Sequence, residues 1–593
     1  MRHISLTAAL VLCGLILMPT VAWETSVSKN LAIQITAGQS PTVVSFSPAS
    51  PVNVSDAATA GTVISQVQVT TSDGQPFAGT VSISAQSVAG MTALSSSTLP
   101  SNLQVASINS GDDGSQTVTV QATENGVTRS ATFTVNVTAA SALPPGVTLS
   151  AIDGETMTGN VMSHNYYARN GFTNAASSTF NSSYNNGGWD DPRFFPIADD
   201  FPFYSGNSTT TYKTLGMNTA HRITGGTDVT FIRSAGIYII DDGGGTNEGA
   251  ELVGWHLDEP ADWTTILNFF QGGVGTGWPG RFAHVAFTWN QLFYGTISGA
   301  PGDSSMPYVM SSPISTSDGN RHINLPADDE YWFAASATGF GQQNPCAHIY
   351  NNGSSCTTDQ MARGDHYGDI VDTMRGWMAT TTPQGFPAPN CPYIETEDGL
   401  VTDAGFRRIL PQEFNWAALS TIVHGARCLL YFGTTSNYGT GSTFGFSQSI
   451  LSGASVSMYN QAIATNSLVA NLAPIINSPF AIGYASVSPA GYVFPTATLS
   501  LANGIDIAAK YYTGGSYTNS TGTFGNGFYI VSTVRGSAAQ TNISATFTLN
   551  GAPSKTIPVV GESRNVTSNS SGVFTDTFAN AYTVHMYGPI PYP

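Results

Sequence analysis

The sequence predicts a multidomain protein in which a central (β/α)8 barrel, residues 148–478, lies between two all-β sandwich domains. Three observations predict it. The chain of 593 residues is too long for a single hydrophobic core. Short segments of alternating polarity occur towards both ends, which is typical of sandwich strands. In the middle, short apolar runs end in polar residues and alternate with longer segments, as strand–helix units do.

Residues 1–22 resemble a signal peptide. Met1–His3 provide a charged start, Ile4–Met18 form a short apolar run, and Ala22 is a small residue at the expected cut. The alternative is an uncleaved membrane anchor, although the run is short for a span. We therefore expect a secreted, periplasmic or cell-surface protein with no membrane span after cleavage.

Residues 23–140 are expected to form the first sandwich, because Thr62–Val69, Gln116–Ala122 and Ala131–Val137 alternate with a period of two between turn residues. This pattern resembles the Ig-like or cadherin-like modules of exported bacterial proteins. Residues 141–147 are then a linker, rich in Ala and Pro.

Residues 479–593 return to short alternating strands with Gly and Asn turns. Phe528–Ser532 and Ala545–Leu549 are clear cases. We expect a second β-sandwich here.

The composition excludes one class of partner. Only 9% of the residues are charged, the formal net charge is −18 and the pI is about 4.7, so the chain offers no basic surface to nucleic acid. At 41% hydrophobic and 11% aromatic residues, it is able to form packed cores. The oligomeric state is left open.

Four cysteines follow the apolar leader. Cys346 and Cys356 flank a short polar loop and are expected to form a disulfide, which export would allow. Cys391 and Cys428 begin two neighbouring predicted strands and are either bridged or buried as thiols. Their spacing does not suggest zinc, and we predict no metal and no cofactor.

Eight apolar runs are predicted as the barrel strands. Their carboxyl ends should meet at one rim of the barrel, which is where (β/α)8-barrel enzymes bind their substrates. In chain order they are Phe194–Ala198, Thr214–Ala220, Gly236–Ile240, Leu252–Leu257, Phe282–Thr288, Tyr331–Ala335, Pro392–Ile394 and Leu429–Phe432.

Glu259 is the first candidate catalytic residue. It precedes Pro260, which disfavours the helical region for it, so we expect Glu259 to stay extended and Pro260 to open a helix. A partly desolvated Glu at the rim would have a raised pKa, as a general acid requires. The alternative is a surface turn whose carboxylate faces a helix N-terminus.

Glu395 is the second candidate, after the short run Pro392–Ile394. Strands four and seven face each other across a closed barrel, so Glu259 and Glu395 would lie on opposite sides of a scissile glycosidic bond. Glu397 is the alternative to Glu395, and either could also be a solvated loop acid.

The stretch Gly254–Pro260 resembles the strand-four motif of the large clan of retaining (β/α)8 glycoside hydrolases. Residues from about 365 to 435 resemble the corresponding part of bacterial glycosidases, and the C-terminal stretch resembles their closing β-sandwich. The resemblance implies that Glu259 is the acid/base and Glu395 the nucleophile. Asp258 stands where the clan usually has Asn, and its charge would raise the pKa of Glu259 further.

Other predicted rim residues would bind the sugar, and each is as readily structural as functional. They are His221, Arg222, Asp242, Asp258, Trp289, Asn290 and Glu397. The resemblance implies that Arg222 lies near the nucleophile and keeps it ionised.

We therefore predict a retaining O-glycosyl hydrolase that acts on a poly- or oligosaccharide. The alternatives are a non-catalytic carbohydrate-binding or adhesion protein and an inverting hydrolase on the same barrel.

Overall fold

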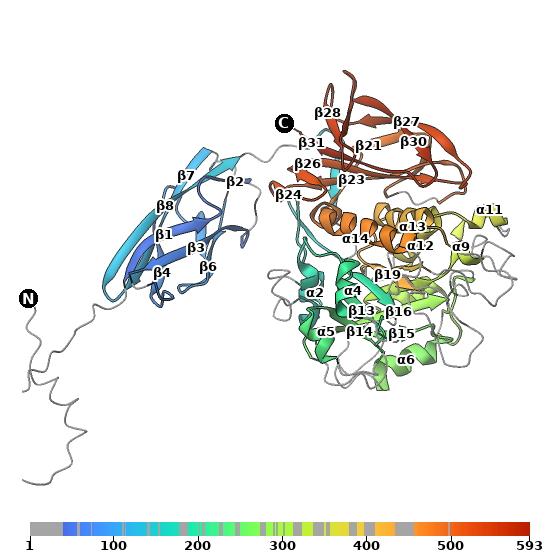
Figure 1. The fold of residues 1–593 in the computed structure, drawn as a ribbon, viewed down its shortest axis with the longest axis horizontal. Helices are drawn as coiled ribbons and strands as arrows, with labels where there is room; N and C mark the ends of the chain where they lie inside the picture. The colour runs from blue at the N-terminus through green and yellow to red at the C-terminus, as the bar shows by residue number, and fades with distance from the viewer. Residues whose placement is uncertain are drawn as a thin grey trace, which may run out of the picture. The chain divides into compact units, whose positions relative to one another are not determined.

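The computed structural model (Figure 1) describes residues 40–592 apart from a series of gaps. The gaps are 56–57, 59, 73, 109–111, 113, 139–142, 152–153, 177–187, 201, 204–207, 224–228, 243–248, 273–279, 289–290, 292–293, 301–302, 312–322, 336–348, 351–355, 379–387, 397–408, 433–455 and 496–498.

Most of residues 40–134 form one compact unit, which contains two four-stranded antiparallel sheets. The strands of one sheet, in spatial order, are β1 (Pro41–Ser47), β3 (Val63–Thr71), β6 (Ser101–Val105) and β5 (Thr92–Leu94). Those of the other are β2 (Val52–Ser55), β8 (Val127–Thr138), β7 (Gly114–Glu124) and β4 (Thr80–Gln86). Phe46 and Phe133, one from each sheet, lie 4.8 Å apart between ring centroids. The expected period-two alternation is present: in β7 the buried side chains are every second one from Val118.

The second unit contains an eight-stranded, all-parallel sheet that curls into a nearly closed barrel. Its strands in chain order are β12 (Ile197–Asp200), β13 (Thr219–His221), β14 (Tyr238–Asp241), β15 (Leu252–Asp258), β16 (Phe282–Thr288), β17 (Leu325–Asp329), β18 (Tyr393–Glu395) and β19 (Leu429–Phe432). Their spatial order is β17-β16-β15-β14-β13-β12-β19-β18. This is the ring order of a (β/α)8 barrel, and the central prediction is confirmed.

The ring closes between β17 and β18, where the Cys391 amide donates a hydrogen bond of 3.0 Å to the Pro326 carbonyl. Cys391 also forms a disulfide with Cys428, which decides the question that the sequence left open. Both cysteines precede their strands, so the bridge joins the amino ends of β18 and β19. Cys346 lies outside the described residues, so its predicted pairing with Cys356 stays a prediction.

One predicted strand is wrong. Tyr331–Ala335 is not the sixth strand; that strand is β17, and Trp332–Ala335 form helix α9. Pro326 inside β17 made this segment a poor strand candidate, because proline cannot donate to a ladder. In the structure the Pro326 carbonyl still accepts the bond that closes the ring. The expected second strand is also shorter, because Thr209–Thr214 form helix α4.

Short elements precede the first barrel strand or connect the barrel strands, and longer helices follow β15, β17, β18 and β19. The short elements are β10 (Met157–Thr158), β11 (Val161–Met162), α2 (Tyr166–Arg169), α3 (Thr173–Ala176), η2 (Gly188–Asp190), α4, α5 (Thr230–Ser234), α8 (Met306–Ser311), α9 and α11 (Thr358–Met361). The longer ones are α6 (Trp263–Gly272) after β15, and α12 (Asp365–Met378), α13 (Pro411–Val423) and α14 (Val456–Ile476). Among the described helices, none is both long and apolar enough to cross a membrane.

The C-terminal residues form three further sheets above α12, α13 and α14 in Figure 1. The largest contains β29 (Arg564–Thr567), β28 (Thr556–Val559), β31 (Val584–Ile590), β26 (Gly527–Arg535), β23 (Gly504–Tyr512), β20 (Phe480–Ile482) and β9 (Thr148–Ser150), with β22 (Ala490–Val493) on β23. The others are β21 (Ala485–Ser488), β27 (Thr541–Leu549) and β30 (Val573–Asn580), and the hairpin β24 (Tyr517–Asn519) and β25 (Gly522–Phe524). Thr148–Ser150, at the start of the segment expected to form the barrel, therefore pair with this region.

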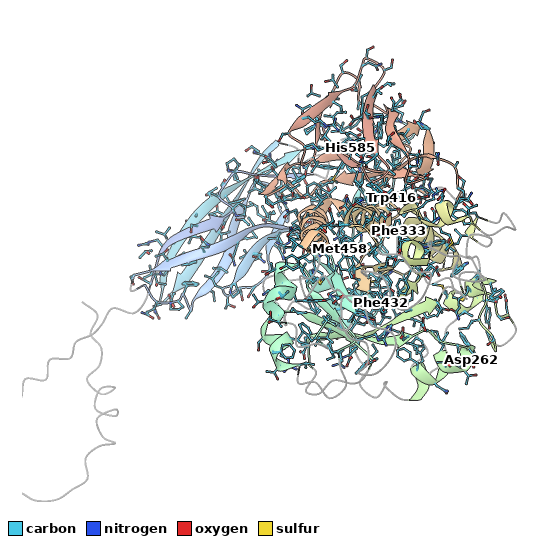
Figure 2. All side chains as sticks on the ribbon, turned by 45° about the vertical axis from the view of Figure 1, so that its right-hand side comes forward. Asp262, Phe333, Trp416, Phe432, Met458 and His585 are labelled. Atoms are coloured by element: carbon cyan, nitrogen blue, oxygen red, sulfur yellow. A yellow bond between two sulfur atoms is a disulfide. The ribbon has the colours of Figure 1, made fainter. Side chains whose placement is uncertain are left out.

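Buried ion pairs join this region to the barrel helices. Arg535, at the end of β26 and almost fully buried, binds both oxygens of Asp369 on α12 and lies 2.7 Å from Asp506 Oδ1. Trp416 on α13, labelled in Figure 2, donates from its indole nitrogen to the Val534 carbonyl at 2.8 Å. Because a buried charge is costly unless it is paired, these contacts fix the sheet against α12 and α13.

The disulfide allows a direct test of how the ring is held. In the double variant Cys391→Ala/Cys428→Ala we expect a lower free energy of unfolding, by about 2–4 kcal/mol, because a bridge across 37 residues constrains the unfolded chain. Thermal unfolding with and without reductant measures it. Wild-type protein unfolded and refolded in reductant should match the variant, and an unchanged melting temperature in the variant would contradict the prediction.

Candidate active site

The carboxyl ends of the barrel strands form one rim, called the mouth here. Glu259 follows β15 directly, and Glu395 is the last residue of β18. β15 and β18 are the fourth and seventh strands of the barrel in chain order, and in the ring they are separated by β16 and β17 on one side. The topology therefore brings the two predicted glutamates to the same end of the barrel, on well-separated strands.

The backbone at Glu259 differs from the expectation. Glu259 is not extended: its φ is +40°, in the left-handed region, and its amide still donates to the Ala286 carbonyl of β16 at 3.0 Å. Pro260 does not open the helix either. Helix α6 begins at Trp263, where the side chain of Asp262 accepts from the Thr265 amide. A following proline disfavours the right-handed helical region for Glu259, but it does not exclude the left-handed conformation with which the chain leaves the sheet here.

Arg222, which follows β13, is the other non-glycine residue with a left-handed φ directly after a described barrel strand, at +50°. Such a backbone costs about 1–3 kcal/mol and persists where the surroundings enforce it. At both Arg222 and Glu259, the left-handed backbone conformation turns the chain away from the strand direction at the mouth.

Glu259 has a second carboxyl group beside it, which was not among the predicted site residues. Its side chain is hydrogen-bonded to Asp329, the last residue of β17. Two carboxyl groups make such a bond only if one of them is protonated. Burial and the charge of Asp258 raise the pKa of Glu259, while Asp329 and Arg222 oppose the rise. Burial raises the pKa of Asp329 far more. The expected direction for Glu259, and the contribution of Asp258 to it, are confirmed.

Glu395 has a contrasting environment. It is fully buried, and its Oε1 accepts a hydrogen bond from the Tyr367 hydroxyl of α12 and another, of 2.7 Å, from the Phe333 amide of α9. Hydrogen bonds to a carboxylate oxygen favour its ionised form. The Tyr367 phenol stays protonated, because burial and the charge of Glu395 raise its pKa.

Arg222 is the cation that holds the acidic residues of the mouth together. Its guanidinium lies 2.7 Å from Asp258, 3.6 Å from Asp200 and 4.0 Å from Asp242. The expected proximity of Arg222 to Glu395 stays a prediction, and Glu395 accepts hydrogen bonds from Tyr367 and Phe333. Burial raises the pKa of both Asp242 and Asp258, and Arg222 lowers it in both.

The acids near the end of β17 add to this surplus of negative charge. Burial raises the pKa of Asp328 well above its usual range, with a further contribution from Glu330. Burial, and then repulsion from Asp329 and Glu395, raises the pKa of Glu330 to about 8. Several carboxyl groups at the mouth therefore keep their protons at neutral pH.

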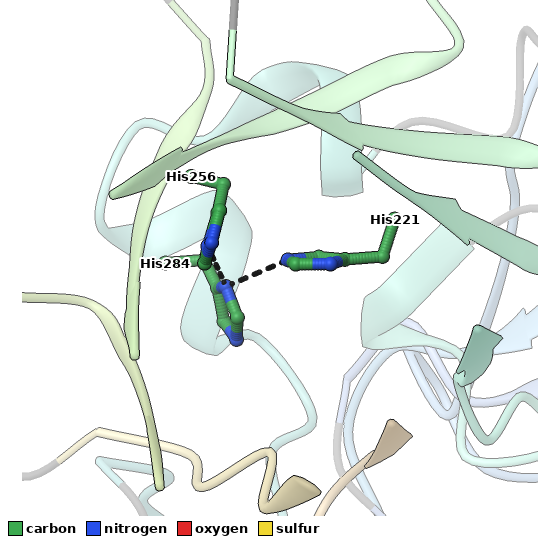
Figure 3. A group of neighbouring side chains, drawn as sticks. All are labelled: His221, His256 and His284. Carbon is green, nitrogen blue, oxygen red and sulfur yellow. Dashed lines mark hydrogen bonds between the residues drawn. The ribbon is translucent and has the colours of Figure 1, made fainter. Parts of the chain in front are cut away.

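His221 is fully buried beneath the mouth, and both of its ring nitrogens have partners. Nδ1 lies 2.7 Å from Asp200 Oδ1, and Nε2 lies 3.1 Å from His284 Nδ1 (Figure 3). In this arrangement it offers no ring nitrogen to a substrate. The predicted residues Trp289, Asn290 and Glu397 lie outside the described residues.

Three residues near the two glutamates were missed: Asp329, Tyr367 and Phe333. Asp329 had a signal, since Asp328-Asp329-Glu330 is a run of acids in a chain with few charges. Tyr367 and Phe333 had none, because their roles depend on where α12 and α9 pack.

A small pocket lies at the opposite end of the barrel. Its lining includes Pro196, Pro389 and Arg427, which precede β12, β18 and β19. It is therefore separate from the mouth and from both glutamates.

Comparisons with known proteins give no family for this chain. No family model matches it, and no curated protein matches it. Among solved structures, it is similar to a putative alpha-galactosidase of Bacteroides fragilis, at 11% identity over 93% of this chain and 98% of that one, with a TM-score of 0.31. It is also similar to a glycoside hydrolase family 5 protein of Bacteroides vulgatus, at 12% identity over 66% and 88%, with a TM-score of 0.37. A stretch of 17% of the chain is similar to 24% of a protocadherin fragment, at 21% identity and a TM-score of 0.14. At these scores none of the three bears on what the chain does.

The buried acids predict how stability depends on pH. Glu330 loses its proton near its ordinary pKa when unfolded, but near 8 when folded. The unfolded state therefore gives up this proton first, so the Glu330 contribution to stability falls as the pH rises from about 4 to about 8. We expect Glu330→Gln to lose less thermal stability than wild type between pH 5 and pH 8.

The matched control is Asp303→Asn, at an exposed acid, which should keep the wild-type pH dependence. Melting temperatures across the range measure the effect. Parallel curves for wild type and Glu330→Gln would contradict the assignment.

Proposed function

We propose that this protein is a retaining glycoside hydrolase, with Glu259 as acid/base and Glu395 as nucleophile. One observation carries the proposal: two glutamates lie at the carboxyl ends of strands four and seven, in contrasting environments. Burial and the charge of Asp258 raise the pKa of Glu259, whereas Glu395 accepts hydrogen bonds from Tyr367 and from a backbone amide. Such a division between two carboxyl groups is what acid and nucleophile roles require.

The chemistry would follow in two steps. Glu259 donates its proton to the glycosidic oxygen while the Glu395 carboxylate attacks the anomeric carbon, which breaks the glycosidic bond and forms a glycosyl ester. Glu259, now ionised, takes a proton from water. The water oxygen attacks the anomeric carbon, and Glu395 leaves with the electrons of its ester bond.

The substrate we propose is a poly- or oligosaccharide. The Arg222–Asp258 ion pair offers charged partners to sugar hydroxyls. Tyr331 and Phe432, whose ring centroids stack at 5.0 Å, stand beside Glu330 and the end of β19 and offer apolar faces near the mouth. We propose the same kind of role for Asp242, Trp289, Asn290 and Glu397.

We further propose that the chain is exported through residues 1–22, and that the sheets on either side of the barrel in sequence are the two expected sandwiches. The Cys391–Cys428 disulfide supports export, because such bridges persist in oxidising compartments. The sandwiches would space or dock the barrel.

Substitution of the two glutamates tests the proposal. On a screened aryl glycoside or polysaccharide, Glu395→Ala should lose activity by about 10³-fold or more, and azide should restore turnover and give a glycosyl azide of inverted configuration. Glu259→Ala should lose about 10²–10⁴-fold on unactivated substrates but much less on aryl glycosides with good leaving groups. There azide should give the retained configuration.

The comparison variant is Glu397→Ala, two residues from Glu395: a sugar-binding role predicts a higher KM at most, with no gain in turnover and no glycosyl azide when azide is added. Rescue of Glu397→Ala alone would make Glu397 the nucleophile. Products of inverted configuration from wild type would identify an inverting enzyme, and carbohydrate binding unchanged in all variants without turnover would identify a binding protein.

The pH dependence of kcat/KM provides a second test. The charge of Asp258 raises the pKa of Glu259, so Asp258→Asn should lower it. Because the acid must be protonated in the first step, the alkaline limb of the profile should move to lower pH. Asp303→Asn is the control. An unchanged or upward-shifted limb would contradict the role of Glu259.

A further inference from the structure

Three histidines meet inside the barrel below the mouth. His221 ends β13, while His256 and His284 are paired neighbours on β15 and β16. All three side chains are buried, and one nitrogen from each ring lies within 4.8 Å of the others. Figure 3 shows the rings converging from separate strands. The proposed hydrolysis uses none of them.

We propose that His221, His256 and His284 bind a divalent transition-metal ion of the zinc class, through one nitrogen of each ring.

The nitrogen spacing supports this. His284 Nδ1 lies 3.1 Å from His221 Nε2 and 2.8 Å from His256 Nδ1. Ligands about 2.0–2.1 Å from a tetrahedral zinc ion are separated by about 3.3 Å. For these two pairs of nitrogens, small shifts of the rings are enough to take the ion, and the third pair lies within 4.8 Å.

The second argument concerns the protons on the ring nitrogens of the three histidines. His221 Nδ1 faces the Asp200 carboxylate at 2.7 Å and so carries the ring proton, which leaves a lone pair on Nε2. A neutral His284 has at most one proton on Nδ1, yet that nitrogen makes short contacts with both other rings. One proton cannot point well at two acceptors, and a proton on His256 Nδ1 as well would clash. A metal ion between the three lone pairs resolves this conflict.

The opposite ring nitrogens fit a metal site as well. A ligating histidine commonly donates its other N–H to a carboxylate. His221 Nδ1 has Asp200, and His256 Nε2 lies 3.5 Å from Asp258 Oδ1.

The ligand set indicates the class of metal. Three imidazoles suit zinc, cobalt, nickel or copper, whereas magnesium and calcium prefer oxygen ligands. Among the described residues the group has three members. Three protein ligands leave a fourth position for water or another small ligand.

A second group, Asp365, His366 and Asp369, is a weaker candidate. Arg363 and Arg535 already pair with both carboxylates, and His366 is bonded to Tyr350 and to the Gln360 carbonyl. Those charges are balanced without a metal, so this group serves as the internal comparison.

The first experiment uses the full chain, purified with a tag that contains no histidine. Elemental analysis after dialysis against Zn²⁺ should give about one zinc per chain. His284→Gln and His256→Gln should lower the zinc affinity by at least tenfold, and Asp200→Asn by about 10–100-fold. His585→Gln, a buried histidine on β31 held by Glu562, should keep the wild-type affinity.

Two results would overturn the proposal: folded wild type that retains less than a tenth of an equivalent of zinc, or loss of the zinc in His366→Gln while the His256 and His284 variants keep it.

The second experiment needs no variant, so it remains decisive if the variants misfold. Wild type reconstituted with Co²⁺ should show the intense visible absorption of a four-coordinate ion. X-ray absorption of the zinc form should show three imidazole nitrogens. A shell of oxygen ligands only would overturn the proposal. Because both readouts are independent of turnover, an inactive protein would contradict the proposed hydrolysis and leave this result standing.

Discussion

The ion pairs of Arg222 are the interaction on which the mouth depends. Parallel strands deliver their carboxyl ends to one rim, and here that rim carries Asp200, Asp242 and Asp258 around a single guanidinium. Without this cation, desolvation and mutual repulsion would favour neutral carboxyl groups throughout. The left-handed backbone of Arg222 places it there, so a local strain is offset by the electrostatics that it makes possible.

Strand β17 connects the two halves of the site. Asp329 at its end makes a hydrogen bond that lowers the pKa of Glu259, while burial, and then repulsion from Asp329 and Glu395, keeps the proton on the next residue, Glu330, to a pH of about 8. The amide of Phe333, one turn further along the chain, donates to Glu395. A single short segment thus contributes groups to both sides of the mouth.

The sequence predicted those features that depend on local pattern. Short apolar runs, most of them ending in polar residues, located seven of the eight barrel strands, at least in part, and placed Glu259 and Glu395 after the fourth and seventh. It failed at β17, where Pro326 weakens the strand pattern and the apolar run beginning at Tyr331 competes with it. The φ of Glu259 was also beyond prediction, because the pre-proline rule excludes one region without choosing among the others.

The histidine cluster shows why other parts of the site were out of reach. His284 follows His256 by 28 residues and His221 by 63, so no short motif links them, and only the parallel register brings their rings together. Their outer partners, Asp200 and Asp258, are also the partners of Arg222. A divalent ion bound by the three rings would therefore attract the same two carboxylates that pair with the Arg222 guanidinium. The charge of the acidic mouth would then be balanced by two cations, and the proton on Glu259 would depend on both.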